Sequence, residues 1–304
     1  MTYDVVDDIV VPELLPPSED GVFRTLMTHP DAKPILRDVV ESYLRFPVLT
    51  VEVRNVELPI SDISEKRERF DVCCTIDDGS QLDVEMQSEA MSGDSLKTSH
   101  MIVKSRAIYH LCDLHSGQGR GVRYDKLLRS FQITLCGYTV FHERDGFVNR
   151  FSFRDENGVE LSDAVGIVFV ELSKLGDVIN KPIEAMSGEE IWSIFFAYAS
   201  DPNYKGLITK LMAAKEEINM AAELLQTIST NEDERARFRM RRKFQMDMEH
   251  NLIAARDEGE TSKALKIAKA MLADGEPVEK IMKYTGLTRK EIEELQKTSD
   301  TGAV

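Results

Sequence analysis

The sequence predicts a mixed α/β domain followed by an all-helical C-terminal region. From about residue 20 to 200, short β-branched and aromatic runs mix with helical stretches, whereas beyond residue 206 the strand signals stop and long charged helical patterns follow. The chain has 304 residues and is 42% hydrophobic, which is enough to build a sizeable core. We therefore predict an N-terminal extension (1–19), an α/β domain (20–205) and a helical region (206–304).

The elements of the α/β domain follow from local residue patterns. Apolar residues at helical spacing predict helices, and alternating polar and apolar residues predict strands. The expected order is one or two helices within 20–47, strands at 49–56, 69–76 and 81–87, a helix at 95–116, strands at 129–141 and 164–172, and a helix at 188–199. The apolar stripe of the helix at 95–116 is expected to comprise Met101, Ile102, Ile108, Leu111 and Leu114.

Composition excludes several classes of protein. There are 38 Lys and Arg against 53 Asp and Glu, so the net charge of −15 argues against a protein coated in positive charge, although a local basic patch or a metal ion stays compatible with it. The four cysteines lack CxxC spacing, which argues against a disulfide framework or zinc ribbon. The acidic N-terminus has no secretory signal and no apolar window reaches the roughly 20 residues of a membrane span. We expect a cytoplasmic protein without a membrane partner.

The segment Gln81–Gln87 separates polar from apolar side chains cleanly. On a strand, Asp83, Glu85 and Gln87 share one face, and the apolar residues between them share the other. The turn after the preceding strand allows two registers. A two-residue loop would place Asp71 opposite Met86, whereas a three-residue loop with a left-handed Gly79 would place Asp71 opposite Glu85. The second register is preferred because it keeps both faces chemically consistent.

Two carboxylates in this position would repel each other unless a cation lies between them. Oxygen ligands of this kind suit a hard cation such as Mg²⁺. The alternative is an ordinary solvent-facing hairpin, which is the more common environment of charged residues. The spacing of Asp71 and Glu85 alone does not decide between the two.

Several ordered segments carry a family resemblance. The hairpin FDVCCTIDDGSQLDVEMQ is followed by Arg106-Ala-Ile-Tyr109 and by the strand RSFQITLCGYTVF. Later come IVFVELSKL, EEIWSIFF and IAKAMLADGEPVEKIMKYTGLTRKEIEEL. In this order, from about Asp20 onward, they resemble the Rpn family of recombination-promoting nucleases and transposases, of the PD-(D/E)XK nuclease superfamily. The resemblance implies a restriction-endonuclease-like mixed sheet flanked by helices.

The resemblance also implies roles for individual residues. Asp71 and Glu85 match the metal-binding carboxylates, and Gln87 matches the glutamine of an ExQ variant of the motif. Arg106 and Tyr109 match an RxxY pattern. Arg106 is expected either to contact phosphate or to be an ordinary exposed helix residue. Tyr109 is expected either to orient the substrate or to pack in the core. Two further acidic residues are candidates to support the metal-binding carboxylates. Asp20 lies in a DxxFK-like segment that has Arg24 in place of lysine, and Asp83 shares the face of Glu85.

The function implied is metal-dependent cleavage of double-stranded DNA, linked to recombination or mobile elements. Mg²⁺ is the expected cofactor, with Mn²⁺ or Ca²⁺ as alternatives. Because a duplex needs two cuts, a homodimer is the natural arrangement for an enzyme with one site. The alternative function is a catalytically decayed, transposase-derived module that binds DNA or protein. The helix histidines His100, His110 and His115 lack ligand spacing, so a zinc site is not expected.

The helical region contains two further features. A cationic run spans 235–243 and could lie along a DNA backbone, or could pair with nearby acidic residues. The layout of 278–291, in which Gly286 precedes a capping box of Thr288 and Glu291, is typical of a helix-turn-helix. Its second helix carries several glutamates, which favours protein contact or dimerisation over base reading.

Overall fold

The computed structural model describes residues 13–54, 71–88, 96–118 and 122–300 of the chain. It divides into two compact units, residues 1–238 and 239–304. The domain limits derived from composition stay a prediction, but α5 (Lys205–Ala214) and α6 (Glu216–Thr230) bury side chains in the core of the first unit. No helix in the described part of the chain is both long and apolar enough to cross a membrane.

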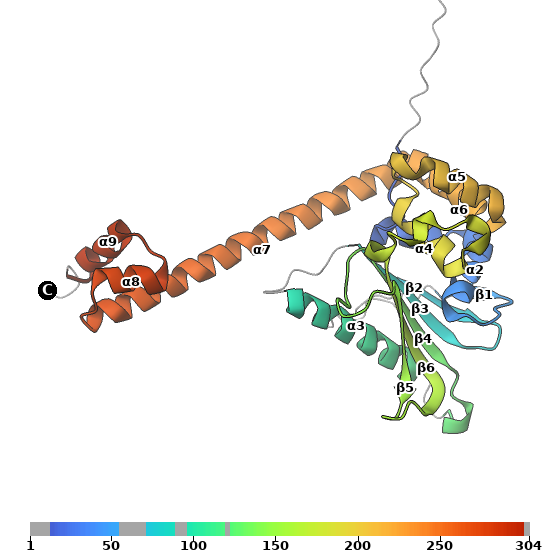
Figure 1. The fold of residues 1–304 in the computed structure, drawn as a ribbon, viewed down its shortest axis with the longest axis horizontal. Coiled ribbons are helices and arrows are strands. Elements are labelled where there is room, and N and C mark those ends of the chain that lie inside the picture. The colour runs from blue at the N-terminus through green and yellow to red at the C-terminus, as the bar shows by residue number, and fades with distance from the viewer. Residues whose placement is uncertain (1–12, 55–70, 89–95, 119–121, 301–304) are drawn as a thin grey trace, which may run out of the picture. The chain divides into compact units, whose positions relative to one another are not determined.

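The first unit contains a mixed β-sheet flanked by helices, as the sequence predicts (Figure 1). In the described ranges the sheet has six strands in the order β1-β2-β3-β4-β6-β5. The strand β4 is parallel to both β3 and β6, and the other neighbours are antiparallel. The strands are β1 (Val51–Val53), β2 (Val72–Ile76), β3 (Gln81–Gln87), β4 (Ser130–Cys136), β5 (Val148–Arg154) and β6 (Glu160–Glu171).

The strand β3 coincides with its predicted range, whereas β1 and β4 are shorter than predicted and β6 is longer. The beginning of the strand predicted at 69–76 and the end of that at 49–56 lie outside the described residues. The edge strand β5 was not predicted. It pairs antiparallel with β6 through an irregular register, and its last residues are exposed.

Two layers of helices cover the sheet. On one face, α1 (Asp20–Met27) and α2 (Lys33–Leu44) contact the strands, and α4 (Gly188–Tyr198), α5 and α6 pack with these helices in the same core. The other face packs on α3 (Leu96–Ser116) (Figure 1). The main core contains the aromatic side chains of α4, including Trp192, whose Nε1 donates to Asp38 Oδ2 at 2.7 Å. Short 3₁₀ turns lie at Pro30–Ala32, Tyr124–Lys126, Leu172–Lys174, Val178–Asn180, Ile183–Ala185 and Pro202–Tyr204.

The face of α3 that meets the sheet differs from the predicted apolar stripe. Leu111 and Leu114 are buried as predicted, but Met101 and Ile108 are exposed. Val103 and Ala107, which lie outside the predicted stripe, are buried against β4 and β6 instead. The prediction chose the most hydrophobic side chains. The helix instead turns small apolar residues, together with Arg106 and His110, toward the sheet because this part of the sheet carries carboxylates.

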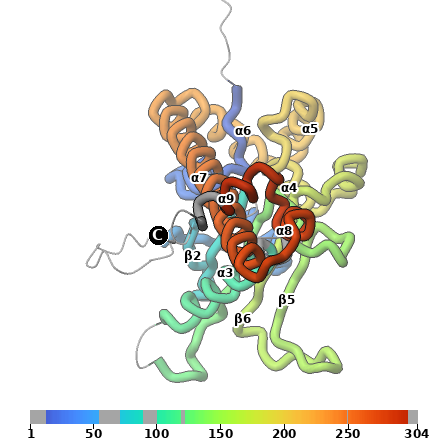
Figure 2. The backbone as a smooth tube through the Cα atoms, turned by 90° about the vertical axis from the view of Figure 1, so that its left-hand side faces the viewer, coloured from blue at the N-terminus to red at the C-terminus, as the bar shows by residue number. Residues whose placement is uncertain are grey.

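The second unit is helical. It comprises α7 (Glu232–Ala273) from residue 239 onward, α8 (Val278–Thr285) and α9 (Arg289–Asp300). Figure 2 shows α8 and α9 beside the C-terminal end of α7, where Ala268, Ile281 and Ile292 form a small buried core. Gly286 has φ 72°, and Thr288 and Glu291 form the expected capping box. The predicted helix-turn-helix layout is therefore confirmed.

Candidate active site

The hairpin of β2 and β3 adopts the register that places Asp71 across from Glu85. Cys73 pairs with Asp83 and Val72 pairs with Val84, so the next position along β2 faces Glu85. Gly79 has φ 84°, which is the left-handed conformation that the three-residue loop requires. Asp71 Oδ2 accepts a hydrogen bond from the Met86 backbone nitrogen at 3.3 Å, which directs this carboxylate across β3.

The polar face of β3 is buried. Asp83 is 0% exposed and Glu85 is 1% exposed, and Gln87 is also buried. The opposite face supplies Leu82, Val84 and Met86 to the main core. The solvent-facing alternative for this hairpin is therefore wrong, because β4 pairs along the whole of β3 and α3 packs on these strands.

Two cationic side chains of α3 point at the same oxygen of Glu85. His110 Nδ1 lies 2.9 Å from Glu85 Oε1, and Arg106 Nη2 lies 3.2 Å from that oxygen. The other carboxylate oxygen, Oε2, accepts from Gln132 Nε2 of β4 at 3.4 Å. His110 Nδ1 also lies 3.4 Å from Asp83 Oδ2. Glu85 is therefore held from three sides before any ligand binds.

His110 is a site residue that the sequence reasoning missed. Its spacing from His100 and His115 was tested as a zinc pattern, but its partners here are carboxylates of β3, at least 25 positions earlier. A usable signal existed in the four-residue step from Arg106 to His110. That step places both side chains on one face of a helix. If Glu85 is buried beneath this helix, the face that carries Arg106 and His110 must be the buried one.

Asp20 joins the site from a distant part of the chain. It is the first residue of α1, and its Oδ1 accepts from the Ser88 backbone nitrogen at 3.0 Å, directly after β3. Asp20, Asp71, Asp83 and Glu85 form what we call the acidic cluster. Burial, followed by the charges of the other three members, raises the pKa of Asp71 to about 7.

The charges of His110 and Asp83 are coupled. Burial lowers the pKa of His110, but its hydrogen bonds to Asp83 and Glu85 outweigh that effect and raise the pKa to about 10. Burial raises the pKa of Asp83 to about 6, although the hydrogen bond from His110 opposes the shift. We infer a positively charged imidazole between two carboxylates. Even with His110 and Arg106 in the site, burial together with the neighbouring carboxylates keeps the pKa of Asp71 well above its ordinary value.

Comparison with known protein families shows to which family the chain belongs. A family model described as PD-(D/E)XK nuclease family transposase matches residues 17–255. The chain belongs to this family. A second model, described as the C-terminal HTH domain of the Rpn/YhgA-like nuclease family, matches residues 261–297. The Rpn resemblance seen in the sequence is thus confirmed. No curated protein and no solved structure matches the chain.

The remaining candidate residues of the nuclease domain lie in different environments. Gln87 lies two residues after Glu85 on the same buried face. Tyr109 is exposed, so the core alternative for this residue is wrong. Tyr138, which the sequence reasoning also missed, lies just after β4. Burial raises the pKa of its hydroxyl, the charge of Arg106 opposes this shift, and the charge of Asp20 adds to it. Its hydroxyl is buried and has no hydrogen-bond partner in the described ranges.

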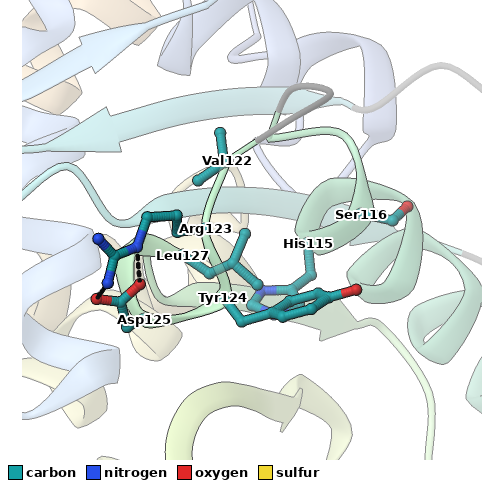
Figure 3. A pocket seen from close by; sticks show the side chains of 7 residues that line it. All are labelled: His115, Ser116, Val122, Arg123, Tyr124, Asp125 and Leu127. Atoms are coloured by element: carbon teal, nitrogen blue, oxygen red, sulfur yellow. Dashed lines mark hydrogen bonds and ion pairs between the residues drawn. The ribbon is translucent and has the colours of Figure 1, made fainter.

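A separate hollow of about 840 Å³ lies at the C-terminal end of α3. Figure 3 shows its lining, in which Arg123 pairs with Asp125 through two contacts of 2.9 Å. Tyr124 is almost fully exposed. None of the lining residues belongs to the acidic cluster, so the hollow of this nuclease domain is distinct from the candidate active site.

Proposed function

We propose that the chain is a metal-dependent DNA endonuclease, linked to DNA recombination or mobile elements, that acts from the acidic cluster. The observation that carries the proposal is the convergence of four carboxylates from α1, the start of β2 and β3 on one mostly buried site. Such a concentration of buried negative charge lowers the stability of the fold, and it is therefore typical of functional sites. Because the chain belongs to a nuclease family, we assign these carboxylates to metal binding.

The residues fit a divalent cation. Asp71 and Glu85 would hold it, and carboxylate oxygens are the ligands that Mg²⁺, Mn²⁺ and Ca²⁺ prefer. Asp83, Glu85 and His110 bring one ligand atom each within 4.8 Å of one another. The charged form of His110 has no free lone pair, so a nitrogen ligand at this position requires that His110 first lose its proton. The pKa of Asp71 is raised by burial and then by repulsion from the neighbouring carboxylates, and a bound cation would relieve that repulsion.

When bound, a divalent cation activates a water molecule and stabilises charge on the phosphate. The chain's own residues position the rest. His110 and Arg106 fix the orientation of Glu85, and the guanidinium of Arg106 is the candidate for contact with a phosphate group. Gln87 can orient a water molecule or a phosphate oxygen, but it cannot supply the charge of a lysine. The substrate is double-stranded DNA, and the C-terminal HTH domain supports DNA binding.

Tyr138→Phe is expected to reduce cleavage about 10-fold without lowering stability. Its buried hydroxyl has no hydrogen-bond partner in the described residues, so its removal leaves no other group unsatisfied. A hydroxyl near Arg106 and Asp20 can donate to a phosphate oxygen. The measurement compares single-turnover cleavage rates and urea unfolding midpoints with those of Tyr124→Phe, which changes an exposed hydroxyl. Equal cleavage by wild type and Tyr138→Phe would remove this residue from the site.

One observation favours the alternative of a decayed binding module. The same oxygen of Glu85 contacts both Arg106 and His110, so two cationic side chains already lie where a metal ion bound to that oxygen would be. The glutamine at position 87, where the wider superfamily has lysine, points the same way. In that case the fold would bind DNA or protein without cutting, and the cations would serve only to stabilise the buried carboxylates.

Cleavage of supercoiled plasmid separates the two functions. Purified wild-type protein is expected to relax or linearise the plasmid with Mg²⁺ or Mn²⁺ and to leave it intact in excess chelator. Ca²⁺ is compared as a third cation because it binds oxygen ligands with looser geometry. Plasmid that stays supercoiled with every cation, while the protein still retards DNA in a gel, would favour the binding module.

A further inference from the structure

The helix α7 carries a row of exposed apolar side chains in the second unit. Met240, Phe244, Met248 and Leu252 are each 45–72% exposed. They follow one another at intervals of four residues and therefore lie within about a third of the helix circumference. We call this row the α7 stripe. Single exposed apolar residues are ordinary, but a continuous row on one side of a helix marks an interaction surface.

Segments of opposite charge lie on either side of the centre of the α7 stripe. A basic segment, residues 239–243, precedes its centre, and an acidic segment, residues 257–260, follows it. Both segments are exposed. They lie about 25 Å apart along the helix, so they cannot pair within one chain. The basic segment contains Arg239, Arg241, Arg242 and Lys243, and the acidic segment contains Asp257, Glu258 and Glu260.

We propose that the α7 stripe is the interface for a second copy of this chain, bound antiparallel. A two-fold axis near Met248 would bring Phe244 of one copy beside Leu252 of the other and cover the stripe on both. The same axis would bring each basic segment within about one helical turn of the partner's acidic segment, which long charged side chains can span. A parallel pair would instead place like charges together, which costs free energy. The surface is thus self-complementary in one direction only.

This interface goes beyond the proposed catalytic function and does not depend on it. It supplies a physical basis for the homodimer that the symmetry of duplex cleavage predicts, because two joined chains carry two active sites. The basic segment then serves pairing between copies. That role differs from both sequence interpretations of the run 235–243, which were contact with DNA and pairing with neighbouring acidic residues.

Sedimentation equilibrium of the full chain, without DNA or added metal, tests the interface. Wild type is expected to form a dimer, and Met248→Glu is expected to raise its dissociation constant at least about 100-fold, because two buried glutamates would face each other across the axis. The matched control is Met246→Glu, which changes another exposed methionine, on the other side of α7, and is expected to leave the dimer intact. A wild type that is monomeric at all concentrations overturns the proposal, as does equal weakening by both variants.

Charge reversal tests the antiparallel direction. Arg241→Glu and Glu258→Arg are each expected to weaken the dimer about 10-fold, whereas the double variant is expected to recover most of the affinity. Circular dichroism checks that each variant keeps its helix content. No recovery in the double variant overturns the antiparallel arrangement. An Arg241→Glu variant that binds DNA more weakly but dimerises normally would assign the basic segment to DNA instead.

Discussion

Asp71→Asn and Glu85→Gln are each expected to lower Mg²⁺-dependent plasmid cleavage at least about 1,000-fold, equivalent to about 4 kcal/mol of transition-state stabilisation. Each substitution keeps the size of the side chain but removes the negative charge that would hold the cation. Neither amide can replace a carboxylate as an anionic ligand. The measurement is the rate of plasmid cleavage at saturating Mg²⁺, with chelator as the blank.

The controls for these two variants are Asp177→Asn and Glu184→Gln, which make the same chemical changes at exposed positions outside the acidic cluster. Both are expected to cut like wild type. Cleavage that persists in Asp71→Asn and Glu85→Gln would assign the activity to another site or to a contaminant. Loss of cleavage in the controls would show that the assay reports folding instead of chemistry.

The two active-site variants should differ in stability. Glu85 is the partner of both His110 and Arg106, so Glu85→Gln leaves two largely buried cations with weaker acceptors. Removing one member of such a group costs about 3 kcal/mol or more. Asp71 has no cationic partner among the contacts described here, and its hydrogen bond to the Met86 nitrogen can be kept by an asparagine oxygen. Asp71→Asn is therefore the cleaner test of metal chemistry.

The sequence predicts the site's β-hairpin well because both of its determinants are local. Alternation along Gln81–Gln87 separates the two faces, and Gly79 after two aspartates selects the loop that brings Asp71 opposite Glu85. Neither inference requires knowledge of the rest of the fold. What the hairpin cannot reveal is its environment, since the burial of Glu85 depends on the parallel pairing with β4 and the packing of α3 on these strands.

The residues that the sequence did not reveal are those whose role depends on that packing. His110 contacts carboxylates from another element. The four-residue step from Arg106 to His110 indicates a shared helix face, but it does not identify which strand that face contacts. Tyr138 lies just past the end of β4, where a strand residue and a site residue have the same local signature. The predicted α3 stripe is wrong at Met101 and Ile108 for the same reason, although Leu111 and Leu114 are buried as predicted. Hydrophobicity ranked Ile108 above His110, but the charges of β3 influence which side of the helix is buried.

Asp71→Asn is also expected to stabilise the metal-free protein, by about 2–4 kcal/mol at pH 8. In the folded chain, burial and the neighbouring carboxylates raise the pKa of Asp71 to about 7, whereas an unfolded aspartate titrates near its ordinary value of about 4. The folded state therefore binds this proton more tightly. The resulting stabilisation is fully present below about pH 4, falls between about pH 4 and 7, and is lost above that range. Asparagine does not ionise and avoids the loss.

The measurement is urea unfolding of both proteins in chelator at pH 5 and pH 8. The advantage of Asp71→Asn over wild type should be larger at pH 8, where the wild-type carboxylate is ionised, and Asp177→Asn should show no such gain. Saturating Mg²⁺ at pH 8 should then reverse the order, because a cation that binds only the folded wild type stabilises it by mass action. If Asp71→Asn is less stable than wild type in chelator, the carboxylate is stabilising the fold, and the acidic cluster is a structural ion-pair network. A gain in stability of Asp71→Asn in chelator that Mg²⁺ reverses would show that one charge has both effects. The Asp71 carboxylate would then both destabilise the metal-free fold and bind the cation, since a single substitution removes both effects.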